Sequence, residues 1–390
     1  MHINMGNLAA GTRRFLIIWF MVVGLLLSSS PAQAQAVSAN TVSDAAMKLL
    51  DFAVNAKAPL DGRAVDVLVD YVLETKSIRE VELPKIRKAT GAYYEFDTGI
   101  DFTRFLQYSY SSQVPSALTS PASLRYSLWS SPDGESQKLP ESWKLPAPDS
   151  PPVVIRGFQR DGITPDLTTG VYYEYNLRRT LVLLNHKGRH VLISISQQTD
   201  VSDVGRKGFI LGYDDDWNYH YTPDIGSAKA GLGWVKSYIY DFFSVGVYVE
   251  ASATPSQVRS GMFQWIRAGW SGINFVQTEH MIKGMKRHAQ NSKSILESPR
   301  LPEPAQIVEA YRRLCTLSQK DLMARYAALH QARHDLAVAG GKIGVRDAKK
   351  QDALIDLSRE QIIEALMLEH FKVVLGKSSL LGKKLARVGH

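Results

Sequence analysis

His330 and His334 form the motif with the clearest chemical potential in this sequence. Histidines four residues apart share one face of a helix and can bind one metal ion, as in the HExxH zinc proteases. Here Gln331 stands where those enzymes carry a glutamate as general base, and the sequence places no third ligand. The flanking residues favour a solvent-facing helix edge. We therefore expect no bound metal and no cofactor, and this pair is the candidate for transition-metal ligands.

Glu279 and His280 are the candidates for an acid–base pair. Neighbouring residues on a helix point in different directions, which weakens a joint catalytic role. His280 also falls on an apolar stripe, where a hydrogen-bonded core histidine is the usual outcome. Whether the protein is an enzyme stays open, and the residue pattern favours a non-catalytic protein.

An acidic turn at Asp214 and Asp216 begins with the spacing of an EF-hand calcium loop and continues to Asn218. That loop requires glycine at its sixth position and glutamate at its twelfth. Tyr219 and Ile225 occupy these positions, which excludes an EF-hand. The turn remains a source of carboxylates for a site whose residues are dispersed in the sequence.

Two potential nucleophiles have stronger structural explanations. Ser271 lies in a GWSGI sequence that lacks the final glycine of the GxSxG nucleophile elbow. Cys315 is the only cysteine, and its position beside Leu314 predicts a packed and inert thiol. A single cysteine also excludes an intramolecular disulfide.

The first residues have the three parts of a secretory signal peptide. Arg13 and Arg14 precede the apolar run Phe15–Leu27, and a small, polar stretch with A-x-A cleavage patterns continues to Ala36. The apolar run is shorter than the roughly 20 residues that a membrane span requires. We expect residues 1–36 to be removed and the mature protein to be exported, to the periplasm or beyond. The lone cysteine and the absence of N-x-S/T sites favour a bacterial envelope protein.

Basic residues are concentrated near the C-terminus. Val37–Pro255 holds 22 Lys and Arg against 26 Asp and Glu, whereas Ser256–His390 holds 22 against 12. This asymmetry favours an acidic protein partner, or a lipid or anionic membrane surface that the C-terminal third would contact. The basic end Lys377–Arg387 alternates with leucines and could lie on such a surface. We expect no nucleic-acid partner, because an exported protein rarely meets one.

The chain divides by composition into four regions after the leader. We expect N-terminal helices and first strands in 37–131, a Pro-rich linker or surface loop in 132–152, an antiparallel sheet region in 153–255 and a basic helical region in 256–390. Residues 153–390 are expected to form one compact unit with 37–131. The fold class is therefore α+β, with an aromatic-rich antiparallel sheet flanked by N-terminal and C-terminal helices.

The clearest local prediction is a β-hairpin. RTLVLL (179–184) and HVLISIS (190–196) are β-rich runs joined by a turn with Asn185 and Gly188. Similar runs on both sides predict an antiparallel sheet of at least five strands between about Gly91 and Ala251.

Helical periodicity appears at both ends of the mature chain. The pattern predicts helices at 42–53 and 64–74, one long or broken helix at 257–288, another at 305–338, and a third that a Ser-x-x-Gln capping box opens at 358 and Gly376 ends.

Aromatic residues give the candidate ligand-binding site. We expect the stripe from Trp265 to Val276 to lie on a helix that covers one face of the sheet, with Trp265, Trp270, Tyr172 and Tyr238 as ligand contacts. The favoured function is an exported, non-catalytic protein that binds a hydrophobic or lipid-like ligand or an acidic partner. The alternative is a periplasmic hydrolase with dispersed catalytic residues.

Overall fold

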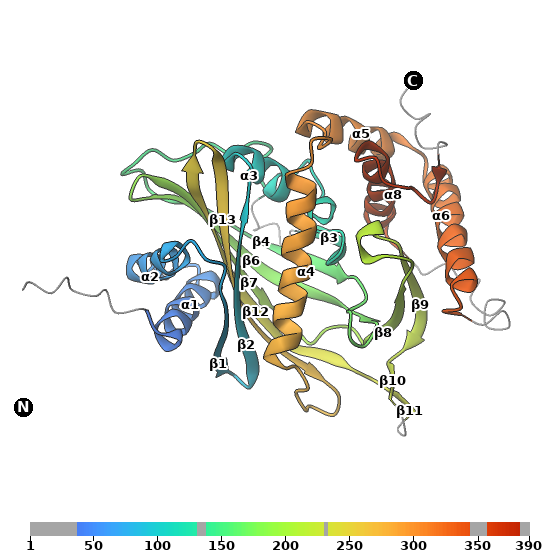
Figure 1. Cartoon of the computed structure of the whole chain (residues 1–390), viewed down its shortest axis with the longest axis horizontal. Coiled ribbons are helices and arrows are strands. Elements are labelled where there is room, and N and C mark those ends of the chain that lie inside the picture. Colours follow the sequence, from blue (N-terminus) through green and yellow to red (C-terminus); the bar gives the residue numbers. More distant parts are fainter. Residues whose placement is uncertain (1–36, 131–137, 230–232, 344–356, 383–390) are drawn as a thin grey trace, which may run out of the picture. The chain divides into compact units, whose positions relative to one another are not determined.

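An eight-stranded antiparallel sheet organises the protein, in the order β1-β2-β13-β12-β7-β6-β4-β3 (Figure 1). The computed structural model describes residues 37–130, 138–229, 233–343 and 357–382. The expected signal peptide lies outside these residues. Helices precede and follow the sheet strands in sequence, which confirms the α+β fold class.

The main sheet is built from strands that are far apart in sequence. Its members are β1 (Glu80–Ile86), β2 (Ala89–Thr98), β3 (Leu124–Ser130), β4 (Val153–Ile163), β6 (Glu174–His186), β7 (Arg189–Gln198), β12 (Tyr238–Ala253) and β13 (Ser256–Gly269). Short strands form two smaller sheets, β5 (Val171–Tyr172) with β8 (Arg206–Ile210) and β9 (Tyr219–Ile225), and β10 (Ser227–Lys229) with β11 (Gly233–Val235).

The helices lie before, between and after these strands. They are α1 (Ala39–Val54), α2 (Gly62–Leu73), α3 (Phe102–Tyr110), α4 (Thr278–Leu296), α5 (Pro304–Thr316), α6 (Gln319–Ala339) and α8 (Arg359–Val374), with short 3₁₀ turns η1 (Ser116–Thr119) and η2 (Asp214–Asp216). No helix in the described part of the chain is long and apolar enough to cross a bilayer.

The predicted hairpin is confirmed as β6–β7. Lys187 and Gly188 form its turn with φ angles of 51° and 80°, and the Gly188 amide donates to Asn185 Oδ1 at 3.0 Å. Both turn residues need the left-handed region, which glycine adopts without steric cost. The turn fixes the register between β6 and β7, and both strands line the candidate site.

One face of the sheet is covered by α1 and α2 (Figure 1). Val182, Ile193, Val247 and Phe263 point to this side from four neighbouring strands and are fully buried against the helices. Helices were predicted for both segments, and both predictions are confirmed. Side chains alternate along a strand, so the residues between these apolar ones must face the opposite side.

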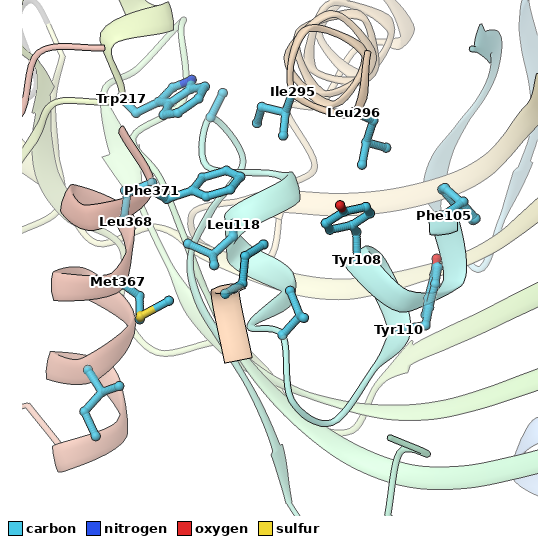
Figure 2. Packing of buried hydrophobic residues seen from close by; sticks show 14 of the residues in the cluster. Phe105, Tyr108, Tyr110, Leu118, Trp217, Ile295, Leu296, Met367, Leu368 and Phe371 are labelled. Carbon is cyan, nitrogen blue, oxygen red and sulfur yellow. The ribbon is translucent and has the colours of Figure 1, made fainter. Parts of the chain in front are cut away.

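The opposite face packs against α3, α4 and the C-terminal helices. Figure 2 shows Trp217 beside Phe371 and Leu118, with Tyr108 and Ile295 in the same cluster. Four of these residues come from α3, η1, α4 and α8, and Trp217 lies between η2 and β9. Their packing joins the basic C-terminal helices to the strands.

The helix predicted for 257–288 is wrong over its first half. Ser256–Gly269 is strand β13, which lies between β2 and β12, and helix α4 begins only at Thr278. Met262 and Ile266, four residues apart, share one side in a helix and equally in a strand. A strand buried on both faces shows no clean alternation of polar and apolar residues, so this spacing could not separate the two structures.

The other helix predictions differ in detail. The segment predicted as one helix at 305–338 is two helices, because α5 ends at Thr316 and Ser318 caps a new helix α6. Helix α8 has the predicted Ser358 capping box, and Gly376 follows it with φ +78°. The described part of the Pro-rich stretch, 138–152, forms no helix or strand.

Candidate functional site

A cleft of about 380 Å³ lies between the sheet and helix α4. Its volume falls within the roughly 300–1,000 Å³ that small-molecule pockets occupy. We call it the sheet cleft. Its floor comes from β4, β6, β7, β12 and β13, and its apolar lining includes Leu177, Phe242, Met262, Ile266, Met281 and Met285.

A row of polar side chains crosses the cleft floor. Arg179 of β6 pairs with Ser196 of β7, Ser196 with Ser244 of β12, and Ser244 with Gln264 of β13. Directly paired residues in antiparallel strands point to the same face. The register therefore aligns one guanidinium, two hydroxyls and one amide across four strands, and all four residues line the cleft.

Arg179 is the positive centre of this row. Its Nη1 donates to Gln159 Oε1 and its Nη2 donates to Ser194 Oγ, each at 2.8 Å. Both partners are neutral, and Arg179 forms no ion pair with a carboxylate of the described residues. Its Nε is buried without a hydrogen-bond partner. A cation held only by neutral groups retains the capacity to pair with an anion.

Asp161 is the acidic group nearest to this arrangement in the hydrogen-bond network. Gln159 Nε2 donates to Asp161 Oδ1 at 2.6 Å, so Gln159 links the carboxyl to Arg179. Ser127 Oγ also donates to Asp161 Oδ1, at 2.7 Å. Burial raises the pKa of Asp161, while the charge of Arg179 opposes this shift. A carboxyl with a raised pKa in a cleft can exchange protons with a ligand.

The roof of the cleft is the face of α4 that carries Met281, Met285 and His288. Burial lowers the pKa of His288 to about 4, so this ring is neutral at pH 7. The two methionines, with their flexible side chains, can adapt to ligands of different shape. The roof also carries Arg287, whose charge is paired with Asp214, so Arg179 is the one arginine of the cleft lining without a carboxylate partner among the described residues.

A second cavity of about 130 Å³ continues from the cleft towards α3 and η1. Arg179, Tyr248 and His288 line both spaces, so the guanidinium lies where they meet. Phe105 and Leu296 give the second cavity its apolar walls. An elongated ligand could occupy both cavities with its anionic group near Arg179.

The predicted acid–base residues are only partly at this site. His280 lines the cleft on α4, although it is exposed rather than a core histidine. Glu279 is exposed as well, and no described hydrogen bond joins either residue to a carboxylate. Asp214 is held by Arg287, which donates from Nε at 2.6 Å and from Nη2 at 2.5 Å.

The predicted aromatic ligand contacts are not brought together. Trp265 is fully buried on the α1–α2 side of the sheet and stacks on Phe243 at 5.3 Å. Trp270 lies in the loop after β13, Tyr172 is buried in the three-stranded sheet, and Tyr238 begins β12. None of the four lines the sheet cleft.

His330 and His334 both lie against a third histidine that the sequence analysis did not include. Their rings are each 5.9 Å from the ring of His220 on β9. Within the described residues, no group of three or more His, Cys, Asp or Glu has an arrangement that could hold a metal ion. The three rings lie where α6 contacts β9.

Two further sequence expectations concern the C-terminal third. Cys315, predicted to be packed, is exposed. In the basic end, Lys377 Nζ donates to the Asp215 carbonyl, and Leu380 and Leu381 pack against the core. Residues 383–390, with the remaining cations of the end, lie outside the described residues. The described part is thus attached to the protein itself.

The residues that form the cleft floor were missed in the sequence analysis. Their signal was present in β6, where Arg179 interrupts the alternate positions Leu177, Leu181 and Leu183 of an otherwise apolar strand face. A charged residue on such a face either has a buried partner or serves a ligand. No protein-family model, curated protein or solved structure matches this chain.

Proposed function

We propose that the sheet cleft binds a small amphipathic molecule with an anionic group. The single observation that carries this proposal is Arg179, a cation in the cleft floor whose described hydrogen-bond partners, Gln159 and Ser194, are both neutral. Charge-assisted hydrogen bonds to a ligand carboxylate or phosphate would occupy its remaining donors. The serines and Gln264 of the same row offer further hydrogen bonds to the ligand's polar end.

The apolar walls support the other half of the proposal. Phe242, Ile266, Met262 and the methionines of α4 line the cleft. Such surface favours an alkyl or aromatic group, since its burial contributes about 25 cal/mol per Å². The favoured ligand class is therefore lipid-like, in agreement with the sequence-based expectation. Export through the signal peptide remains part of the proposal, whereas an acidic protein partner finds no support in this cleft.

A matched pair of probes tests the ligand class. Dodecanoate and dodecanol have the same chain length and differ in the charge of the head group. Binding to the mature protein would be measured by displacement of the fluorescent anion 1-anilinonaphthalene-8-sulfonate, with native mass spectrometry to detect co-purified molecules. We expect dodecanoate to bind more tightly than dodecanol by about ten- to a hundredfold, the range of a hydrogen bond to a charged group.

Two neighbouring arginines supply the variant and its control. Arg179→Met removes the cleft arginine that has no carboxylate partner among the described residues, whereas Arg287 stays paired with Asp214. This variant should lose the preference for dodecanoate. Arg178→Met removes a cation from the other face of the same strand, where Arg178 donates to the Val54 carbonyl, and should leave the preference intact. Equal affinity for the two probes in the unaltered protein, or an unchanged preference in Arg179→Met, would refute the proposal.

A hydrolytic role is the second candidate, and the observation that favours it is Asp161. This carboxyl lines the cleft with a raised pKa, as a general acid requires. His280 and His288 line the same space, but no described hydrogen bond links either ring to Asp161 or to a serine. Turnover of chromogenic esters or phosphates that Asp161→Asn abolishes, while the fold persists by circular dichroism, would favour catalysis over simple binding.

A further inference from the structure

Three segments meet at one end of the sheet, where β13 leads into α4 (Figure 1). Asn274 donates from Nδ2 to the Lys88 carbonyl at 3.2 Å, which attaches this loop to the β1–β2 turn. The Gly272 amide donates to Tyr240 Oη at 2.8 Å, which attaches it to β12. We call the exposed and half-exposed side chains gathered here the basic-aromatic rim: Arg87, Lys88, Tyr240, Arg267, Trp270, Ile273 and Phe275.

The rim presents apolar groups to solvent. Ile273 is 54% exposed and Phe275 is 40% exposed. Phe275 stacks on Trp270 with ring centroids 3.7 Å apart and an angle of 18°. A turn with Ser271 and Gly272 at φ 52° and 76°, closed by the Ile273 amide on the Trp270 carbonyl, holds the isoleucine outward. An ordered apolar patch of this kind indicates an interaction surface.

Cations surround these apolar groups. Arg87 and Lys88 are exposed in the β1–β2 turn, and the Arg267 guanidinium lies 5.3 Å from the Tyr240 ring. The exposed Lys85 and Lys236 stand close in sequence to the same segments. By the same criterion, the nearby carboxylates are the half-buried Asp241, which faces Arg87 and Arg267, and the exposed Glu82 and Glu279. Cations therefore outnumber carboxylates at the rim.

We propose that the basic-aromatic rim docks onto an anionic lipid bilayer. Tryptophan and tyrosine favour the interfacial region of a bilayer, and the adjacent arginine and lysine side chains complement its negative surface. This inference goes beyond ligand binding in the cleft and does not depend on it. Ile266 and Phe242 line the cleft and lie beside Arg267 and Asp241 in sequence. Docking through the rim thus brings one end of the cleft to the membrane.

Vesicle co-sedimentation tests the proposal with the mature protein. We expect binding to phosphatidylglycerol vesicles and not to phosphatidylcholine vesicles, with weaker binding at high salt. Arg87→Asn/Lys88→Asn keeps a residue that tolerates the left-handed φ angles of 51° and 65°. Because each surface cation contributes about fivefold to the partition coefficient, this double variant should bind about 25-fold more weakly. Ile273→Asp should abolish most of the remaining binding.

Matched controls make the same kinds of substitution away from the basic-aromatic rim. Arg312→Asn/Lys320→Asn removes two exposed cations from α5 and α6, and Val54→Asp adds a charge at a residue that is 47% exposed on α1. Both should bind vesicles like the unaltered protein. The proposal is overturned by an absence of vesicle binding, by binding that only the α5–α6 control loses, or by a dimer in sedimentation velocity that Ile273→Asp dissociates. If Arg179→Met still binds vesicles, docking through the rim does not depend on ligand binding in the cleft.

Discussion

Glu369 and Lys372 form an ion pair with no exposed surface on either side chain, with 2.7 Å between Nζ and Oε1. Lys372 also donates to Asn218 Oδ1 at 2.7 Å, before β9. The second carboxylate oxygen of Glu369 accepts from Ser379 Oγ and from the Leu380 amide, both at 2.9 Å. One buried pair thus links α8 to the β9 region and to the chain that follows α8.

Removing one member of this pair should be far worse than neutralising both. Lys372→Met leaves the buried Glu369 carboxylate with only Arg333, whose Nη2 lies 3.8 Å from Oε1, and breaking a buried pair costs about 3–5 kcal/mol in the free energy of unfolding. In Lys372→Met/Glu369→Gln the amide still accepts from Ser379 and Leu380 and carries no charge, so part of the loss should be recovered. The buried Arg333 then lacks its carboxylate partner, which limits the recovery. Urea unfolding of both variants measures the difference. A double variant no more stable than Lys372→Met would contradict this account.

The free energy of unfolding should depend on pH through the ionisation of Glu364. Burial raises the pKa of this carboxyl to about 8, and its Oε2 accepts from the Ser127 amide at 3.0 Å. The native state then holds a proton that the unfolded chain releases near pH 4.5. The stability linked to this proton is fully present below about pH 4.5, and it is lost as the pH rises through about 8.

Glu364→Gln isolates this contribution. The amide can keep the hydrogen bond from Ser127 and cannot ionise, so the variant should equal the unaltered protein near pH 5 and exceed it at pH 8.5. Each pKa unit corresponds to about 1.4 kcal/mol, so the gap should reach a few kcal/mol. Urea unfolding at pH 5, 7 and 8.5 provides the test. Parallel pH profiles for the two proteins would show that Glu364 ionises normally.

Local signals in the sequence predicted much of the fold. Capping at Ser358, the Asn185–Gly188 turn and the periodicity of α1 and α2 each depend on neighbouring residues, and each prediction was confirmed. Strand β13 forms a hairpin with β12 and pairs on its other side with β2, whose residues lie more than 150 positions earlier in the chain. Its burial on both faces removes the alternation that would have identified it. The error therefore reflects burial on both faces, which follows from a pairing with β2 and a covering helix that no local pattern encodes.

The misassigned Trp265 leads to a specific prediction. Its Nε1 donates to the Pro84 carbonyl at 3.0 Å, and its ring lies over Gly91, where an added Cβ would come within 2.6 Å of Nε1. Trp265→Phe should lower stability by about 1–3 kcal/mol through the unpaired carbonyl and lost volume. Dodecanoate affinity should stay unchanged, because this side chain faces the helices α1 and α2. A thermal melt and the displacement assay measure the two effects.

Trp270→Phe provides the comparison for this substitution. This residue lies in the loop after β13, so its replacement should change stability by less than about 0.5 kcal/mol. If Trp265→Phe binds dodecanoate more weakly at a temperature where the protein is fully folded, Trp265 contributes to ligand binding as the sequence predicts.

The cleft itself could not be predicted from single residues. Arg179, Ser244 and Gln264 come from three strands, and only the pairing register places them in one row. Each residue alone resembles an ordinary surface position. Arg179 does interrupt an apolar strand face. That interruption indicates a ligand cleft only once α4 is known to cover this part of the sheet.

Filling the cleft should raise the stability of the protein and weaken ligand binding. Ser244 lies in the polar row of the floor, is half-buried and takes part in no described side-chain hydrogen bond. Ser244→Leu places an alkyl group in empty space and should raise stability by up to about 1 kcal/mol, as cavity-filling substitutions do. A ligand that shares this space must then be accommodated by repacking that costs about 1–3 kcal/mol. The Kd for dodecanoate should therefore rise about ten- to a hundredfold.

Ser244→Ala is the matched control, since it removes the hydroxyl without filling the cleft. If the hydroxyl matters only as one of several hydrogen-bond donors, this variant should weaken dodecanoate binding by less than about tenfold. Opposite changes in melting temperature and affinity in Ser244→Leu are the expected signature of a site whose open volume is kept for a ligand. Unchanged affinity in that variant would place the ligand outside the sheet cleft, because an occupied floor cannot tolerate the added side chain.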